Sequence, residues 1–363
     1  MIEATDQMIL WAIVIARFLL PIAIPRYPLA AIIGSLALDG VDQTLFQWFT
    51  DLPLDGYQGY DKALDIYYLT IAYISTLRNW TNLFAVGLGR FLFFFRLIGV
   101  ALFELTELRW LLLVFPNTFE YFFILIEALS LRCNPARIDK MKLIEAVAII
   151  WIFVKLPQEY WIHVARMDTT EWIRANPLGI ILVFALTALL IIAIWSLLKG
   201  ESPSILCLYL TVNAIPSSLS GSSRLIATKD LAERYINSAL IEKIVLISLV
   251  SLIFAQVLPG VQAKSVQIAI AVAFLIVINT ALSLWLSRRG ASWRSTIQEF
   301  VVMSGVNLLL LTLFYIFLQH RLSGFIDLET TLFFVLLLTL NVTLYDRYWK
   351  IYMLRIDRSR RQR

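Results

Sequence analysis

Residues 180–198 read IILVFALTALLIIAIWSLL, and residues 266–286 read VQIAIAVAFLIVINTALSLWL. Neither run contains a charged residue, and each is long enough to cross a hydrocarbon core of ~30 Å as a helix. Such a core contains no water, so every backbone amide has to pair within its own segment, as it does in a helix. The two runs therefore predict an α-helical membrane protein.

The composition extends this prediction to the whole chain. Of its 363 residues, 60% are hydrophobic and 16% are charged, and the mean hydropathy is +0.77. About a quarter of the residues of an average soluble domain are charged. We therefore expect an all-α, polytopic integral membrane bundle with about 10–11 transmembrane helices of ~20 residues. Their apolar runs centre on 8–24, 29–49, 62–79, 83–105, 110–130, 141–157, 178–198, 238–258, 265–286, 297–318 and 328–345.

The longest polar interval, 199–237, is rich in proline, serine and glycine and predicts a boundary between two bundles. No removable signal peptide is expected, because MIEATDQ at the start of the chain lacks a basic region. We expect four parts. Residues 1–132 form an N-terminal bundle with an acidic hairpin, and residues 133–199 form connecting membrane helices, with an interfacial helix near 159–174. Residues 200–236 form a polar loop, and residues 237–363 form a C-terminal bundle with a basic tail.

Basic residues gather at the C-terminus, where residues 346–363 read DRYWKIYMLRIDRSRRQR. A basic segment beside a membrane helix suits the anionic cytoplasmic leaflet. We therefore predict a protein of the cell or inner membrane whose C-terminus is cytoplasmic. The expected partners are membrane lipids, and no nucleic acid is expected to bind. Counting Lys and Arg in the short loops then places Arg26 and Arg78 inside and the acidic interval 50–61 outside.

Several classes of enzyme are disfavoured because their motifs do not occur. The sequence contains no Walker A motif, no HExxH, no GxSxG and no Rossmann fingerprint. The two cysteines, Cys133 and Cys207, lie far apart, so neither a disulfide framework nor a CxxC site is predicted.

The segment 38–68, LDGVDQTLFQWFTDLPLDGYQGYDKALDIYY, gathers six aspartates and one lysine between two apolar runs. Asp39 and Asp42 lie three residues apart, and Asp61 and Asp65 four apart, so each pair shares a helix face. A hairpin between the two helices would bring the pairs together at the membrane boundary. Four carboxylates in one place repel one another unless a cation lies between them.

A hard divalent ion such as Mg²⁺ or Mn²⁺ suits these oxygen ligands, and Mg²⁺ commonly joins carboxylates to substrate phosphates. Lys62 offers a different way to offset part of the charge. A simpler interpretation is that Asp61 caps the start of a helix, where a carboxylate is favourable. Asp51 and Asp55, in TDLPLDGYQG, are typical turn residues.

The two aspartate pairs give residues 10–70 a partial resemblance to the CDP-alcohol phosphatidyltransferases. That family carries D-x-x-D-G-x-x-A-R-x8-G-x-x-x-D-x-x-x-D across its second and third membrane helices. Asp39-x-x-Asp42 and Asp61-x-x-x-Asp65 reproduce both pairs, Gly56 stands near the middle glycine, and Arg17 resembles the arginine of the family's first helix. The sequence departs from the motif in having Gln43 for the glycine, Phe46-Gln47 for Ala-Arg, and one additional residue between the pairs.

The resemblance implies displacement of CMP from a CDP-lipid by an alcohol. By the same resemblance, Asp39, Asp42 and Asp61 would hold divalent ions together with Asp65, which would also act as the base on the attacking hydroxyl. The metal would neutralise charge that develops on the phosphate oxygens.

Other ionisable residues occur inside the predicted spans, where they are costly and are functional candidates by default. Arg96 and Glu104 are eight residues apart and share a helix face, as do Glu120 and Glu127, which are seven apart. Arg17, Arg96 and Arg109 could pair with Glu104, Glu120 or the aspartates, either to fix packing or to contact a substrate. The run 238–286 carries little charge beyond Glu242, Lys243 and Lys264, so we expect a site within the first 130 residues.

A further candidate is EYWIHVARMDTTEWIR at 159–174. His163 and Asp168 could bind a metal or move protons, although their spacing matches no specific motif. Trp161 and Trp172 favour the alternative, a helix that lies at the membrane interface.

Three functions remain from this sequence. The first is a divalent-metal-dependent transferase that acts on a lipid-linked phosphate. The second is a non-enzymatic membrane protein, either a carrier or an assembly subunit. The third is an extracytoplasmic glycosyltransferase that uses a lipid-linked sugar, which the predicted outside position of the hairpin favours.

Overall fold

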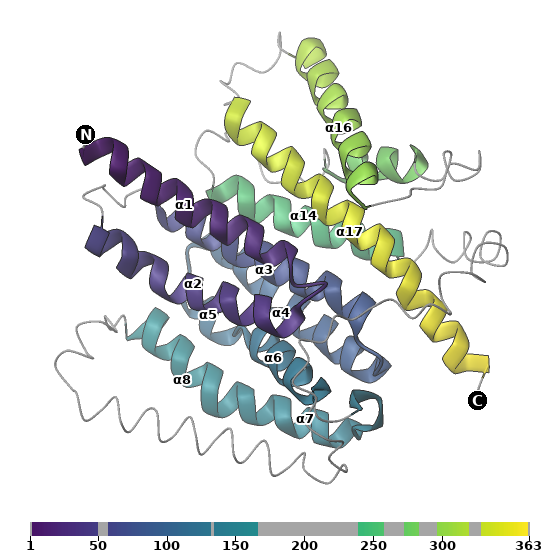
Figure 1. Cartoon of the computed structure of the whole chain (residues 1–363). Helices are drawn as coiled ribbons and strands as arrows, with labels where there is room; N and C mark the ends of the chain where they lie inside the picture. The colour runs from purple at the N-terminus through teal and green to yellow at the C-terminus, as the bar shows by residue number, and fades with distance from the viewer. Residues whose placement is uncertain are drawn as a thin grey trace. The chain divides into compact units, whose positions relative to one another are not determined.

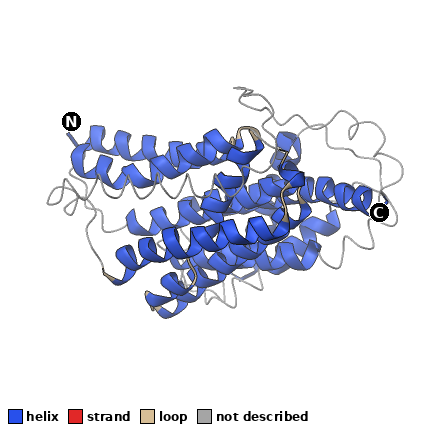
Figure 2. Ribbon diagram, turned by 90° about the horizontal axis from the view of Figure 1, so that it is seen from below, coloured by secondary structure: helices blue, strands red, loops and turns tan. Residues whose placement is uncertain are grey.

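A computed structural model describes residues 2–49, 57–131, 134–165, 239–257, 272–282, 296–318 and 328–361. All regular structure in these ranges is helical, and no strand occurs in them (Figure 2). The all-α class is therefore confirmed. The predicted polar loop at 200–236 lies outside the described residues.

Contacts between Cα atoms divide the chain into two units. The first unit comprises Met1–Arg78 and Val212–Arg363, so the two ends of the chain share one unit, and the second comprises Asn79–Thr211. The helices of the first unit are α1 (Ile2–Ile22), α2 (Pro28–Phe49), α3 (Tyr57–Asn79), α14 (Leu240–Val257), the short helix Val272–Leu282, α16 (Thr296–Leu318) and α17 (Leu328–Arg361) (Figure 1).

A tight turn at residues 23–27 joins α1 to α2, and Pro28 is the first residue of α2. Proline suits this position because the first helical amide has no partner within the helix. The guanidinium of Arg78 donates a hydrogen bond of 2.8 Å to the carbonyl oxygen of Pro25. The C-terminal end of α3 therefore lies beside the turn between α1 and α2.

The basic tail of α17 contacts the same end of α3. Arg355 donates hydrogen bonds to the carbonyl oxygens of Leu77, at 3.5 Å, and of Arg78. The last carbonyls of a helix carry partial negative charge, so a cation there stabilises α3. Burial, and to a lesser degree the nearby Arg78, lower the pKa of Arg355. This part of the tail therefore serves the packing of the unit.

The second unit begins with a long helix, and its next helices are interrupted. Its elements are α4 (Leu83–Thr106), α5 (Trp110–Val114), α6 (Thr118–Ser130), the 3₁₀ turn η2 (Pro135–Arg137), α7 (Lys140–Ile149), the π-helical η3 (Ile150–Lys155), α8 (Leu156–Glu159) and the π-helical η4 (Tyr160–Val164). Pro116 falls in the gap between α5 and α6, as expected from its missing amide and its fixed φ. Helix α4 passes this gap at Gly99, where an added Cβ would lie 2.1 Å from the Cβ of Phe115.

Two stretches of the described residues, Leu83–Thr106 and Trp110–Ser130, are long and apolar enough to cross a membrane by length and composition. Within these two stretches, 44% and 61% of the most apolar window is buried inside the structure. Shorter apolar helices occur at Ala12–Ile22, Val272–Leu282 and Ile297–Leu310.

Candidate functional site

Three aspartates of the predicted hairpin meet at one buried guanidinium, that of Arg17 on α1. Its Nη1 donates to the carboxylate of Asp42 and its Nη2 to that of Asp39, both on α2. The same Nη2 lies 3.9 Å from Oδ1 of Asp65 on α3. We call these four residues the arginine–carboxylate cluster.

The cluster lies in the interior of its helices. Asp39 comes eleven residues after Pro28, so with a rise of ~1.5 Å per residue it lies ~16 Å along α2 from the turn. Asp65 lies thirteen residues, or ~20 Å, before Arg78 at the matching end of α3. The sequence predicts these aspartates at the boundary of the second and third spans. The structure places Asp39 and Asp42 in the middle of α2, because this helix continues to Phe49.

Packing around Arg17 holds α1 against both other helices. The rings of Phe18 and Tyr67 stack with 5.1 Å between centroids, and the Tyr67 hydroxyl donates to the carbonyl oxygen of Phe18 at 3.1 Å. On the α2 side, a Cβ added to Gly34 would lie 3.1 Å from a methyl carbon of Leu20. The absence of a side chain at Gly34 thus allows the close approach that brings Arg17 to Asp39 and Asp42.

The remaining hairpin residues are only partly described. Asp61 and Lys62 lie in α3, with Asp61 one turn before Asp65, but their side chains lie outside the described part of the structure. Asp51 and Asp55 lie outside the described residues altogether.

The carboxylates of the cluster differ in their exposure to solvent. Three carboxylates face one guanidinium, and their side chains differ in exposure, with Asp42 at 2%, Asp39 at 23% and Asp65 at 33%. Among the described residues, no group of three His, Cys, Asp or Glu side chains is arranged to hold a metal ion. The cation between the carboxylates in this structure is Arg17, one of the partners that the sequence suggested. Asp39 and Asp65 are the two carboxylates of the cluster that are partly exposed.

A second group of charges surrounds the gap between α5 and α6. We call it the broken-helix cluster, and it consists of Arg96, Asn117, Glu120, Lys155 and Glu159. The ammonium of Lys155 lies 3.6 Å from the carboxylate of Glu120, which also accepts a hydrogen bond of 3.0 Å from the Asn117 amide. The carboxylate of Glu159 lies 3.8 Å from Arg96 and accepts the backbone N–H of Asn117 at 3.1 Å.

The broken-helix cluster pairs two cations with two carboxylates and so has no excess charge. It also satisfies groups that the helix break exposes, since Arg96 donates to the carbonyl oxygen of Phe115 at 3.0 Å. Buried backbone groups need such partners wherever a helix is interrupted in an apolar setting. We therefore assign this cluster to the packing of the second unit. Arg96 and Glu120 are among the residues predicted from the sequence, whereas Lys155 and Glu159 are not. The four-residue spacing of Lys155 and Glu159 in an apolar run is the signal that identifies them.

The other predicted candidates have no printed contact with either cluster among the described residues. Glu127 accepts a hydrogen bond of 2.8 Å from the indole of Trp80 within the second unit. Arg109 is exposed just before α5, and Glu104 is half-buried on α4. His163 has its backbone in η4, but its side chain and all of Asp168 lie outside what the structure describes.

Comparisons of the chain with protein-family models, with curated proteins and with solved structures find no match, so the functional argument rests on this geometry.

Proposed function

We propose that this protein is a multi-pass membrane transferase that acts on a lipid-linked phosphate, with the arginine–carboxylate cluster as its site. One observation carries the proposal: aspartates up to 26 residues apart on α2 and α3 meet at Arg17 within the helices. These are the residues through which the chain resembles CDP-alcohol phosphatidyltransferases. Ionisable groups in the interior of apolar helices are costly, so their presence there favours a functional role.

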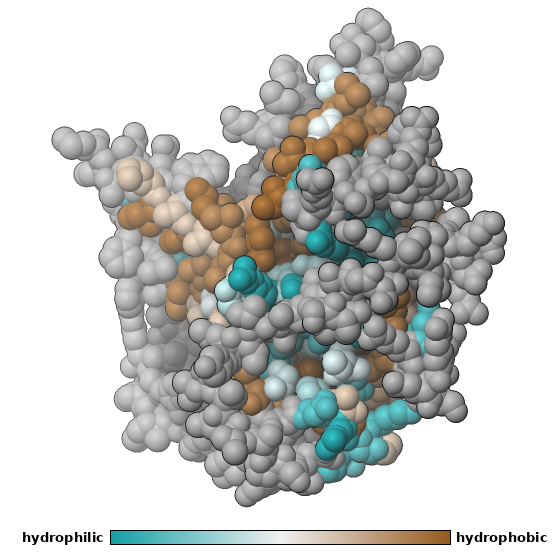
Figure 3. Space-filling view, turned by 45° about the vertical axis from the view of Figure 1, so that its right-hand side comes forward, coloured by the Kyte–Doolittle hydropathy of each residue, from teal (hydrophilic) through white to brown (hydrophobic). Residues whose placement is uncertain are grey.

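The exposed apolar side chains support the membrane part of the proposal. On α4, Phe91, Ile98, Leu102 and Leu105 are exposed at intervals of seven, four and three residues, which places them on one face. Met8, Ile15, Leu19 and Ile22 of α1 repeat the same intervals. Figure 3 shows that hydrophobic side chains reach the surface in broad areas. Large apolar surfaces of this kind are typical of contact with lipid or another protein.

The chemistry of the proposal is what the resemblance implies, and the exposure of the carboxylates supports the assignment of their roles. The oxygen of the alcohol attacks the phosphorus atom that carries the lipid in the CDP-lipid. A new P–O bond forms between the alcohol and this phosphorus, and the P–O bond that joins it to CMP breaks. Asp65 takes the proton of the hydroxyl, because it is the most exposed of the three and lies farthest from Arg17. Arg17 positions the aspartates. Mg²⁺ or Mn²⁺, when bound with the phosphate, would neutralise charge on its oxygens, and Asp39 and Asp65 are the residues that would hold it.

The test is CMP release by the purified full-length chain from CDP-diacylglycerol, with and without an alcohol acceptor and Mg²⁺ or Mn²⁺. We expect release that requires both additions and that falls by about 10²–10⁴-fold in Asp65→Asn, the usual contribution of a general base. The matched control is Asp139→Asn, because Asp139 is an exposed N-cap of α7 and asparagine caps a helix equally well. Equal activity of the two variants would contradict the role of Asp65.

A second function, a non-enzymatic carrier or assembly subunit, is favoured by the position of the Arg17 guanidinium. It pairs with Asp39 and Asp42 and lies 3.9 Å from Asp65, so a side chain of the chain itself stands where a metal ion would neutralise these carboxylates. A folded chain that releases no CMP with any acceptor would favour this function over the transferase.

The side of the membrane on which the hairpin lies separates the third function from the first. A single cysteine at Asp55, in a chain without Cys133 and Cys207, can be labelled in intact cells with a membrane-impermeant reagent. Labelling before lysis would remove a cytosolic CDP-lipid reaction and favour a lipid-linked sugar donor. Labelling only after lysis would favour the CDP-lipid reaction.

A further inference from the structure

Basic side chains from three separate parts of the first unit come together at one end of its helices. Arg78, at the end of α3, donates to the carbonyl oxygen of Pro25, and Arg26 follows that proline in the turn between α1 and α2. Arg355, on α17, donates to the carbonyl oxygens of Leu77 and Arg78. We call Arg26, Arg78 and Arg355 the three-arginine end.

Packing holds two of these guanidiniums in place. The guanidinium of Arg78 lies 5.5 Å from the ring centroid of Tyr348, which is buried on α17. Tyr348 and Arg355 are seven residues apart and therefore share one face of α17, the face that contacts the end of α3. Burial, and then the positive charge of Arg78, lower the pKa of Arg355. The fold thus places two cations close together, an arrangement that a bound anion stabilises.

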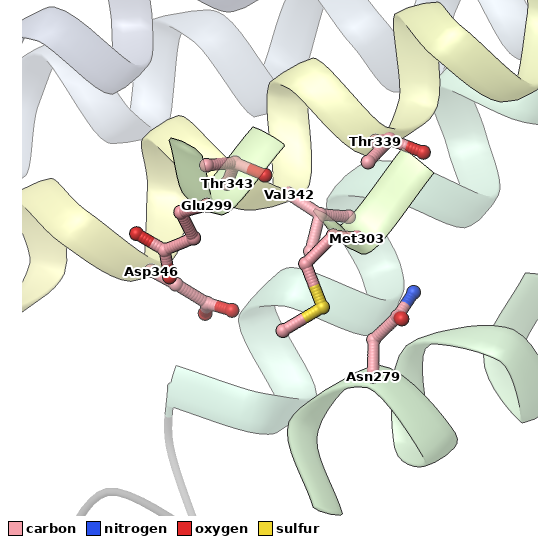
Figure 4. Close-up of a pocket in the computed structure, with 7 residues that line it drawn as sticks. All are labelled: Asn279, Glu299, Met303, Thr339, Val342, Thr343 and Asp346. Atoms are coloured by element: carbon pink, nitrogen blue, oxygen red, sulfur yellow. The ribbon is translucent and has the colours of Figure 1, made fainter. Parts of the chain in front are cut away.

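On the opposite side of α17, cations lie beside carboxylates of the chain itself. Asp346 is nine residues, or two and a half turns, before Arg355, and it lines a small pocket together with Glu299 of α16 (Figure 4). The cations that act on Glu299 are Lys350, Arg347 and Lys243. Lys243 also donates to Asp346 at 2.8 Å. The two sides of α17 therefore differ, because Arg355 is placed against a second cation.

Positive charge predominates around the three-arginine end. Residues 347–363 contain seven basic residues and one acidic residue, Asp357. Asp357 is two residues from Arg355, a spacing at which side chains on a helix do not face each other. The carboxylate of Glu242, on α14, accepts a hydrogen bond from the hydroxyl of Tyr73, five residues before Arg78 on α3. This end of the unit is therefore suited to an anionic partner.

The exposed apolar face of α1 ends at the same place. Leu19 and Ile22 belong to this face, and Ile22 is four residues before Arg26. Tyr27 is also exposed, and its ring centroid lies 5.5 Å from the Arg26 guanidinium. Tyrosine and basic side chains at the end of an apolar helix are typical of the membrane interface, where acyl chains give way to phosphates. The partner that fits both surfaces is a phospholipid.

We propose that the three-arginine end binds the phosphate of an anionic phospholipid, whose acyl chains lie along the exposed apolar face of α1. Guanidiniums are suited to phosphate because their N–H groups form paired hydrogen bonds with its oxygens. The sequence predicts Arg26, Arg78 and the C-terminal tail on the cytoplasmic side, where the leaflet is anionic. The bound phosphate links α17 to α3 and to the turn after α1.

This lipid is distinct from the proposed substrate. The arginine–carboxylate cluster lies ~16–20 Å along the helices from the three-arginine end, so a phosphate bound at one does not reach the other. The inference therefore rests on the membrane part of the proposed function and not on its reaction.

The experiment measures thermal unfolding of the purified full-length chain in micelles of a neutral detergent with increasing phosphatidylglycerol or phosphatidylcholine. A ligand that binds only the folded state raises Tm in a saturable way. We expect the larger rise, at the lower concentration, with phosphatidylglycerol, because phosphatidylcholine has no net charge. Inorganic phosphate at the same concentrations should leave Tm unchanged, since it lacks acyl chains.

Two variants that each remove one exposed positive charge locate the site. In Arg26→Gln the half-saturating concentration of phosphatidylglycerol should rise about fivefold, the usual effect of one cation at an anionic lipid surface. Lys350→Gln is the matched control, because Lys350 lies on the pocket side of α17, and it should change that concentration by less than about twofold. Arg355→Gln, judged by the same concentration and not by Tm itself, should behave like Arg26→Gln.

Each contrary outcome has a different meaning. Equal rises with the two lipids would overturn the anionic site and leave the membrane part of the proposed function intact. An equal rise with inorganic phosphate would overturn the lipid in favour of a free anion. Equal effects of Arg26→Gln and Lys350→Gln would overturn the site in favour of a general attraction to the basic tail. No response to either lipid would overturn the inference together with the membrane part, whereas a failure of CMP release would concern the reaction alone.

Discussion

The arginine–carboxylate cluster and the broken-helix cluster are both buried ionic groups in apolar helices, yet they differ in charge and in construction. In the first, one guanidinium faces three carboxylates, two of which are partly exposed. In the second, two cations face two carboxylates, and the side chains also satisfy a backbone interrupted at Pro116. Complete compensation is what packing requires, whereas an excess of accessible carboxylates is what a site for a cation or a metal-bound phosphate requires. The comparison therefore teaches that two buried ionic groups can differ in the partners that they satisfy, and it is the first group, with its partly exposed carboxylates, that we propose as a site.

The largest effect should follow the loss of Arg17. In Arg17→Met, the three carboxylates lose their common counterion, and removing one partner of a buried ion pair costs about 3–5 kcal/mol. Denaturant unfolding in detergent micelles measures the free energy of unfolding. The control is Arg26→Met, because Arg26 is exposed in the turn after α1 and contacts the ring of Tyr27 at 5.5 Å, a contact worth about 0.5–1 kcal/mol. Similar stability of the two variants would show that the cluster does not depend on its guanidinium.

A smaller loss of stability, which a second substitution should restore, is expected in the broken-helix cluster. Lys155→Met leaves Glu120 with the Asn117 amide, and we expect a loss of about 3 kcal/mol in the free energy of unfolding. Because this cluster is proposed to serve packing, the double variant Lys155→Met, Glu120→Gln should regain most of that loss. The same unfolding measurement on both variants gives the coupling energy. If the double variant is as unstable as the single one, the charges of this cluster have a role beyond packing.

The smallest effect should come from the helix break itself. Gly99→Ala would place a methyl group 2.1 Å from the Cβ of Phe115, and overpacking of this kind costs about 1–3 kcal/mol. Gly87→Ala on the same helix is the matched control, because a Cβ there has no neighbour within 4 Å, and alanine is favoured over glycine in a helix by about 1 kcal/mol. Opposite signs for the two changes would confirm the close approach of α4 to the break. A neutral Gly99→Ala would contradict it.

The sequence by itself determined the helical class, which the described residues confirm; the prediction came from uncharged runs such as 180–198, whose backbone would have to pair its amides within one segment in lipid. It also determined that Asp39 and Asp42 share a helix face, since the three-residue spacing requires this. Arg17 could be named as a possible partner of the aspartates because it is one of few cations in the N-terminal runs.

Only the tertiary structure decided which charges meet. It brought Asp39 and Asp42 of α2 together with Asp65 of α3 at the guanidinium of Arg17. It also paired Lys243 with Asp346, which is 103 residues away, so the sequence could single out the lysine but could not identify its partner. Periodicity specifies the face of one helix, but the partner of a buried charge depends on which distant helices pack against that face. That choice follows from contacts between segments, and the spacing of residues within one segment contains no information about it.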